Sequence, residues 1–204
     1  MWPATPVTES ESTYIPFNRF CKTGAEFTYI QQAIDEMHVS GNGRFTKLCH
    51  VLLEELLGAP KVLLATSCTD ALEMAALLLD VQPGDEVILP SFTFVCTASA
   101  FALRGARPVF IDIRPDTLNL DETLLERLIK PRTKAIVPVH YAGVGCEMDA
   151  ILEIARSHGL PVVEDNAHGL LGSTREGTSA PSAAWRRRAF TKPRTSPAAK
   201  AEPW

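Results

Sequence analysis

Residues 84–113 read GDEVILPSFTFVCTASAFALRGARPVFIDI, and their pattern decides the fold. An apolar run at Glu86–Leu89 is followed by a segment of helical period at Thr93–Arg104 and then by a second apolar run at Pro108–Ile113. Buried parallel strands have continuous apolar sequences, and a helix between two such strands makes a βαβ unit. This stretch therefore predicts two parallel strands joined by a helix.

The same alternation continues on both sides of this unit. Further strands are predicted at Val62–Ala65, Ala135–Val139 and Pro161–Glu164. Further helices are predicted at Phe45–Leu57, Asp70–Leu79, Asp121–Ile129 and Asp149–His158. We expect an α/β fold with a mostly parallel sheet flanked by helices. The first sixty residues differ, and they predict a flexible polar arm at residues 1–14 and a single helix.

Composition limits the class of protein. With 204 residues, 46% of them hydrophobic, the chain can bury one core. The formal net charge of −4 does not favour nucleic acid as a partner, because phosphate-backbone binding needs basic residues. No apolar run is long enough to predict a membrane span, and no signal peptide is recognisable, so a cytoplasmic location is expected. Five widely spaced cysteines predict neither a disulfide framework nor a metal site.

Small hydroxyl residues follow the first predicted strand. Residues 65–73 read ATSCTDALE and lead from that strand into a helix. Free amide N–H groups and the positive end of the helix dipole at Ser67–Asp70 could hold a phosphate group. The alternative is that these residues only cap the helix. Residues alone leave both interpretations open.

Aromatic and acidic residues follow two other strands. Phe92 and Phe94 come after Glu86–Leu89, at the sheet edge where open α/β folds bind ligands, so one ring could stack on a flat cofactor. Core packing is the alternative. The strand near Val163 ends in Glu164 and Asp165, and an acid there could face a pyridine nitrogen or cap the next segment.

Two histidines lie near the same edge. His168 follows Asp165 by three residues, and the residues alone favour a hydrogen-bonded side chain in the core or at the rim over a catalytic base. His140 ends another strand and is predicted to lie at the rim of the cleft.

Together these segments resemble the DegT/DnrJ/EryC1/StrS family of sugar aminotransferases from about Ile15 to Ser173. The resemblance is carried by Thr66–Leu79, Pro83–Arg104, Asp112–Glu122 and Val137–Asp149. It implies the N-terminal part of the large domain of a fold-type-I transferase that depends on pyridoxal 5'-phosphate (PLP). It also implies a homodimer that acts on a nucleotide sugar with glutamate as the amino donor.

The resemblance implies roles for five residues. Cys68 and Thr69 match positions that hold the cofactor phosphate, and Phe94 matches the aromatic residue stacked on the pyridine ring. Asp165 matches the acid paired with the pyridine nitrogen. His168 matches a position close to the ring oxygen. No metal ligand is implied.

The catalytic lysine of the family is missing. In the family, a Schiff-base lysine in a Ser-Phe-His-Glu-Thr-Lys-Asn motif carries the cofactor and moves protons, while the amino group passes from glutamate to the 4-keto carbon of the sugar. The substrate implied for this chain is a dTDP-4-keto-6-deoxyhexose. This motif should follow soon after Gly172, and it is absent. Lys192 lacks the motif's neighbours. We therefore predict no catalytic residue in this chain and little or no activity.

The tail suggests a reason for the missing motif. Residues 173–204 are rich in Pro, Ala, Ser and Arg without apolar period, which predicts disorder. Read one base earlier, the codons of Phe190–Thr195 permit His-Glu-Thr-Lys-Asn. Our hypothesis is a one-base change near Ser173–Ser179 that puts the tail out of frame. The alternative is a basic arm, centred on Trp185–Arg188, for nucleic acid or a membrane.

The predicted organisation is therefore an arm at residues 1–14, a partial aminotransferase large domain at 15–172 and a tail at 173–204. Two alternatives to an enzyme remain open at this point. One is a lysine-less protein that binds PLP or a nucleotide sugar without chemistry. The other is a non-functional truncated product.

Overall fold

The structure is a computed structural model that describes residues 22–169. The predicted arm at 1–14 and the predicted tail at 173–204 lie outside the described residues, so both stay predictions. The chain divides into two compact units, one up to Lys47 and one from Leu48 onward. The boundary falls within helix α2, Arg44–Leu57.

The first unit contains a helix that the sequence analysis missed. Helix α1 spans Glu26–Asp35, so the prediction of a single helix in the first sixty residues is wrong. The Glu26 carboxylate accepts hydrogen bonds from the backbone N–H groups of Thr23 and Gly24. The bond from Thr23 is the main reason that the pKa of Glu26 is lowered to about 2. Tyr29 of α1 packs edge-on against Phe45, with ring centroids 5.5 Å apart.

The second unit contains the parallel sheet. Its strands are β1 (Glu86–Pro90), β2 (Arg107–Ile111) and β3 (Thr133–Ile136), in the order β2-β1-β3 with both pairings parallel. Parallel bridges Ile136–Val162 and Val139–Asp165 place residues 162–165 beside the end of β3. The segment predicted as a strand at Pro161–Glu164 is thus paired through isolated bridges only. The predicted parallel α/β fold is confirmed.

The predicted strand at Val62–Ala65 is wrong, because these residues form no strand. Their backbone groups bond to side chains of α2 instead of to a neighbouring strand. The Val62 N–H donates to Glu54 Oε1 at 3.0 Å, and the Leu64 N–H donates to His50 Nε2 at 3.0 Å. An apolar run in the sequence does not show which acceptors its backbone N–H groups will bond to.

Three α-helices flank the sheet, namely α3 (Cys68–Leu78), α4 (Val95–Ala102) and α5 (Met148–Ser157). The predicted helix at Asp121–Ile129 is wrong. That segment forms two short 3-10 turns, η1 (Glu122–Leu124) and η2 (Glu126–Leu128). The Asp121 carboxylate accepts from the N–H of Thr123, two residues on, and this local bond favours a tight turn over an α-helix.

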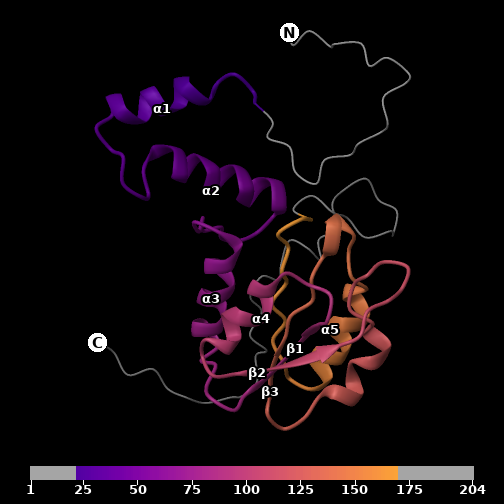
Figure 1. The fold of residues 1–204 in the computed structure, drawn as a ribbon. Helices are drawn as coiled ribbons and strands as arrows, with labels where there is room; N and C mark the ends of the chain where they lie inside the picture. The colour runs from indigo at the N-terminus through magenta and orange to yellow at the C-terminus, as the bar shows by residue number, and fades with distance from the viewer. Residues whose placement is uncertain (1–21, 170–204) are drawn as a thin grey trace, which may run out of the picture. The chain divides into compact units, whose positions relative to one another are not determined.

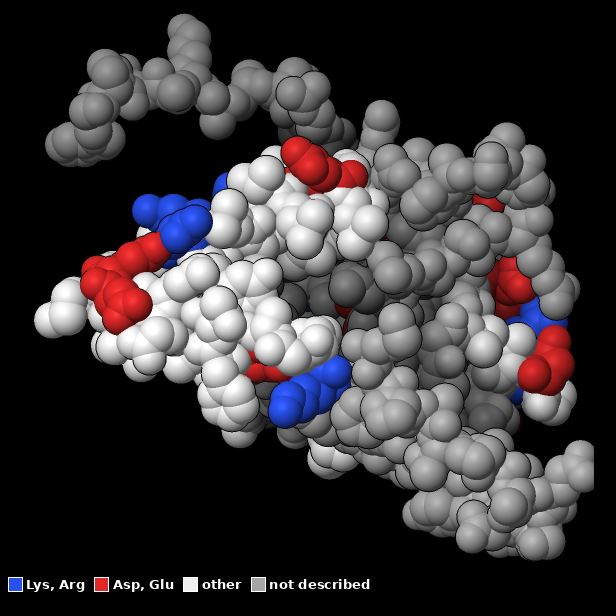
Figure 2. Space-filling model, turned by 90° about the horizontal axis from the view of Figure 1, so that it is seen from above, with Lys and Arg blue, Asp and Glu red and all other residues white. Residues whose placement is uncertain are grey.

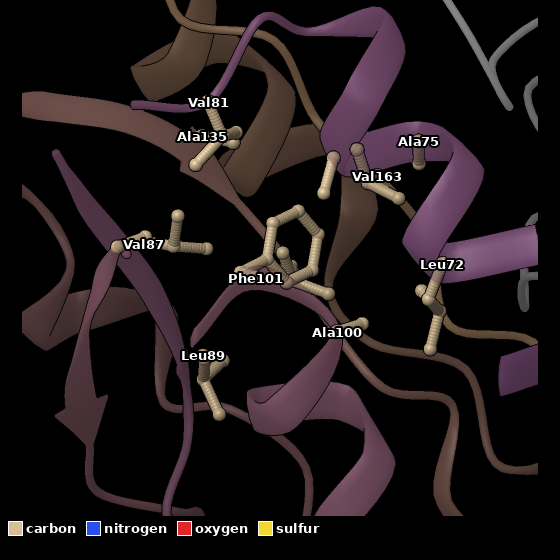
Figure 3. Close-up of a cluster of buried hydrophobic side chains, with 12 residues drawn as sticks. Leu72, Ala75, Val81, Val87, Leu89, Ala100, Phe101, Ala135 and Val163 are labelled. Carbon is tan, nitrogen blue, oxygen red and sulfur yellow. The ribbon is translucent and has the colours of Figure 1, made fainter. Parts of the chain in front are cut away.

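Two apolar clusters pack on opposite faces of the sheet, because alternate residues of a strand point to opposite sides. Val87 and Leu89 face α3 and α4, whereas Ile88 faces α5. Figure 1 shows α3 and α4 on one side of the strands and α5 on the other. In Figure 3 the Phe101 ring lies in the middle of the first cluster, where it is 0% exposed.

Charged side chains of the described residues are scattered on the face of the molecule that is seen from above in Figure 2. Figure 2 shows Lys and Arg side chains on one face as small separate groups rather than a continuous basic patch. Several large apolar side chains are exposed, including Leu63, Leu78 and Leu103. Among residues 22–169, no helix is long and apolar enough to cross a membrane.

Candidate cofactor site at the carboxyl ends of the strands

Segments that are far apart in the sequence meet at one edge of the sheet. Parallel strands end at the same edge, which is where open α/β sheets bind ligands. Asp165 lies there at the end of residues 162–165, and its side chain contacts both Cys68 at the start of α3 and Thr97 in the first turn of α4. The structure therefore brings the predicted residues Cys68 and Asp165 together.

Asp165 is the best-anchored polar side chain of this edge. The residue is only 4% exposed. Its Oδ2 accepts a hydrogen bond from Thr97 Oγ1 at 2.6 Å. Its Oδ1 accepts from Cys68 Sγ at 3.5 Å and from the backbone N–H of Ala167 at 3.3 Å. A buried carboxylate costs much free energy unless donors satisfy it, and here three donors do so.

Cys68 contributes a neutral thiol to this arrangement. Cys68 is exposed as a residue, but partial burial of its thiol raises the pKa of Cys68 to about 12, and the negative charge of Asp165 adds to the increase. The thiol therefore keeps its proton at neutral pH and donates it toward Asp165. The side chain of Cys68 thus contacts Asp165, and its backbone N–H has no acceptor among the described residues.

Residues at the start of α3 both cap the helix and leave backbone amides available for a phosphate group, the two interpretations that the sequence left open. Ser67 is the capping residue, and its Oγ accepts from the N–H of Asp70 at 3.1 Å. Thr66 and Ser67 donate their hydroxyls to the Asp70 carboxylate, and the bond from Thr66 is the main cause of its lowered pKa. Among the described residues, the N–H groups of Cys68 and Thr69 have no acceptor. The cap thus leaves two amides of the positive helix end for an anion.

Phe94 lies at the N-terminus of α4 and is 69% exposed. Its backbone is extended there, with φ −70° and ψ 145°. Core packing, the alternative interpretation of this ring, is therefore excluded for Phe94. An exposed aromatic ring beside a ligand edge is available for stacking.

His168 contacts a different part of the edge. Its Nδ1 accepts a hydrogen bond from the N–H of Ala142 at 3.3 Å, and its ring meets Tyr141 edge-on at 5.6 Å between centroids. Tyr141 in turn lies 4.5 Å from the Phe92 ring. His168 is exposed and forms an aromatic rim with Tyr141 and Phe92.

His140 is buried rather than at the rim, which corrects the prediction for this residue. It is 1% exposed, and its Nδ1 accepts from the N–H of Cys146 at 3.2 Å. Because Nδ1 is the acceptor, Nε2 carries the proton and donates to Glu164 Oε2 at 3.2 Å. This hydrogen bond joins the segment that follows β3 to Glu164, the residue directly before Asp165.

The sequence analysis missed two residues that shape the site. Thr97 lies four residues after Thr93, so the two hydroxyls share one side of the chain, and they lie 2.8 Å apart. Asn119 is 1% exposed; its Oδ1 accepts from the N–H of Tyr141 and its Nδ2 donates to the carbonyl of Val144. These two bonds hold the loop at residues 141–144, which carries Tyr141 of the aromatic rim. The four-residue spacing was a signal for Thr97, whereas no local pattern pointed to Asn119.

Comparison with known proteins identifies the family. Residues 21–187 match the model of the DegT/DnrJ/EryC1/StrS aminotransferase family. The chain belongs to this family. The match continues past Ser173–Ser179, where we predict the one-base change, so it does not support that prediction.

Similar proteins act on nucleotide sugars according to their names. The chain is 42% identical over 154 residues to GDP-perosamine synthase of Caulobacter vibrioides, covering 76% of this chain and 41% of the relative. It is 50% identical over 115 residues to UDP-2-acetamido-2-deoxy-3-oxo-D-glucuronate aminotransferase of Pseudomonas aeruginosa, covering 56% and 32%. The chain thus spans less than half the length of these relatives.

A solved structure shows the same fold with a cofactor. It is a candidate sugar aminotransferase from Streptococcus pneumoniae in its PMP form, 34% identical with a TM-score of 0.73, covering 83% of this chain and 45% of that one. The same protein is also known in its PLP form. Members of this family depend on PLP. The donor set here fits that cofactor, because a buried carboxylate suits a protonated pyridine nitrogen and the free amides of α3 suit its phosphate.

Proposed function

We propose that this chain is the cofactor-binding part of a PLP-dependent sugar-nucleotide aminotransferase. The observation that carries the proposal is the Asp165 carboxylate, buried at the carboxyl edge of the sheet with three donors holding it. A structural carboxylate needs no position at the ligand edge, whereas a partner for a pyridine nitrogen does.

For the substrate we propose a dTDP-4-keto-6-deoxyhexose, with glutamate as the amino donor. This assignment is part of the proposal and rests on the resemblance of Thr66–Leu79 and Pro83–Arg104 to the dTDP-4-amino-4,6-dideoxygalactose transaminase of enterobacterial common antigen synthesis. The two curated relatives above carry GDP- and UDP-sugar names, which supports the wider class of nucleotide sugars.

Four residues would hold the cofactor. The backbone N–H groups of Cys68 and Thr69 would bind its phosphate at the positive end of α3. Asp165 would accept a hydrogen bond from its ring nitrogen. Phe94 would stack on the ring, and its exposure leaves its face free for this contact. We also keep His168 as a contact near the ring oxygen, reached from the rim.

When bound, the cofactor supplies an electron sink for the carbanion formed at the amino-bearing carbon. The role of the chain is to place a negative charge opposite the ring nitrogen and to hold the cofactor in a fixed orientation. Asp165 would favour a proton on the ring nitrogen, and the three donors of Asp165 hold its carboxylate in place. The cluster around Phe101 fixes α3 and α4 against the sheet, so that the two helix starts stay at the same edge.

The remaining features of the proposal concern the whole protein. We propose a homodimer in the cytoplasm, with residues 15–172 as part of the large domain. We also propose that the tail is out of frame and that the chain is inactive because the lysine motif is missing.

A second candidate is a protein that binds the cofactor or a nucleotide sugar without catalysis. The free amides of α3 and the anchored Asp165 favour it, because these features need no lysine. Both candidates predict saturable binding of pyridoxamine phosphate, which needs no covalent link. They differ in turnover with glutamate and a keto sugar.

The test starts with purified chain titrated with pyridoxamine phosphate. Saturable binding that Asp165→Asn weakens supports the site, whereas binding that does not change with Asp165→Asn refutes it. In a parallel sample, PLP is added, reduced with borohydride and located by peptide mass mapping. We expect no stoichiometric label at Lys192. Specific labelling of Lys192 would overturn the out-of-frame tail.

A further inference from the structure

The hydroxyl of Thr97 makes the shortest contact to Asp165. Thr97 is 0% exposed, and its Oγ1 lies 2.6 Å from Asp165 Oδ2 and 2.8 Å from Thr93 Oγ1. An ionised carboxylate can only accept, so the Thr97 proton points to Asp165. Thr97 must then accept from Thr93. The direction of this hydrogen-bond chain, from Thr93 through Thr97 to Asp165, is therefore determined.

The donors around Asp165 leave little freedom for its carboxylate. A carboxylate has roughly four acceptor positions, and three of them are used here. The two hydrogen bonds to Oδ1 are longer, at 3.5 Å from Cys68 Sγ and 3.3 Å from the N–H of Ala167. The bond from Thr97 is the short one and the only one on Oδ2 among the described residues, so it has the largest effect on how the carboxylate is turned.

We propose that Thr97 is a positioning residue that sets the direction in which Asp165 presents its remaining acceptor position to the ring nitrogen of the cofactor. The inference rests on the proposed function, since it assumes that Asp165 faces that nitrogen. Thr97 itself does not touch the cofactor. It acts through Asp165. The hydrogen bond from Thr93 keeps the Thr97 hydroxyl directed toward Asp165.

The test separates orientation from a general effect on the fold. Affinity is measured for pyridoxamine phosphate and for its analogue with C–H in place of the ring nitrogen. Thr97→Val keeps the branched shape and removes the hydroxyl, whereas Thr97→Ser keeps the hydroxyl. Ser99→Ala serves as the control, because it removes a hydroxyl from the same helix at a residue without a contact to Asp165 in the described structure.

We expect the unchanged chain to prefer the nitrogen-containing ligand. Thr97→Val should reduce this preference roughly ten-fold, which is the scale of one hydrogen bond to a charged group. Its affinity for the C–H analogue should stay the same. Thr97→Ser and Ser99→Ala should keep the preference, and Asp165→Asn should abolish it.

The outcomes distinguish the two proposals. If Asp165→Asn abolishes the preference and Thr97→Val does not reduce it, the role of Thr97 is wrong while the site stands. Equal weakening of both ligands by Thr97→Val also overturns it, because that result indicates a structural role only. If the unchanged chain shows no preference or no binding, the proposed site fails and the role of Thr97 fails with it.

Discussion

Replacing Asp165 by Asn tests the centre of the proposed site. Asn keeps the shape of the side chain and removes its charge. Its amide oxygen can still accept from the N–H of Ala167 and the thiol of Cys68, and its NH₂ group can donate to Thr97 once the Thr97 hydroxyl turns. The fold should therefore survive the change. What is lost is the negative charge opposite the ring nitrogen.

The size of the effect follows from the burial of this carboxylate. Asp165 is 4% exposed, so water does not screen or replace its charge. A hydrogen bond to a charged group contributes about 1.5–3 kcal/mol, and each 1.4 kcal/mol is a factor of ten in affinity. Binding of pyridoxamine phosphate should weaken by roughly ten-fold to a hundred-fold. Turnover of a frame-corrected, full-length version should fall by about 10²-fold or more.

The assay compares both forms by ligand titration and by thermal unfolding without ligand. The frame-corrected enzyme is then assayed for amino transfer with cofactor saturating. Unfolding temperatures should be similar, so that weaker binding reports the site and not the fold. Near-normal turnover of Asp165→Asn with cofactor bound would refute the assignment of Asp165 and the alignment of residues 164–168.

Two further changes test the surroundings of this carboxylate. The pKa of Cys68, raised to about 12, predicts very slow alkylation of this thiol at pH 8; Asp165→Asn removes the second cause of the increase, so alkylation should become faster, and an unchanged rate would show that Asp165 does not act on the thiol. Ser67→Ala removes the cap of α3 and should lower the free energy of unfolding by about 1 kcal/mol, measured by urea denaturation. Ser67→Asn supplies another capping side chain and should restore most of the loss; equal loss in both variants would argue against the cap.

Sequence reasoning predicted well wherever the pattern is local. The apolar run at Glu86–Leu89 and the helical period at Asp70–Leu79 each reflect burial of one face, which the residues themselves encode. It failed at residues 62–65, where partners from another element decide the structure, because the amides of residues 62 and 64 bond to α2 side chains. It also failed at residues 121–129, where a local bond from the N–H of Thr123 to Asp121 favours a tight turn that the apolar period does not show.

For the candidate site too, some features follow from the sequence and others only from the tertiary structure. The sequence by itself determined that the chain is parallel α/β, that it resembles a sugar aminotransferase, that Cys68 lies at the start of a helix, and that Phe94 and Asp165 follow segments of the sheet whose ends can form a ligand edge. These conclusions depend on residue type and order along the chain.

Only the tertiary structure decided which of these residues touch. Cys68 and Asp165 are 97 positions apart, and their contact requires α3 and residues 162–165 to reach the same edge of the sheet. The same packing turns the Thr97 hydroxyl toward Asp165 and buries His140 beside Glu164. Hydrogen bonds form over about 3 Å, so they depend on how the elements pack against each other, which no local pattern specifies.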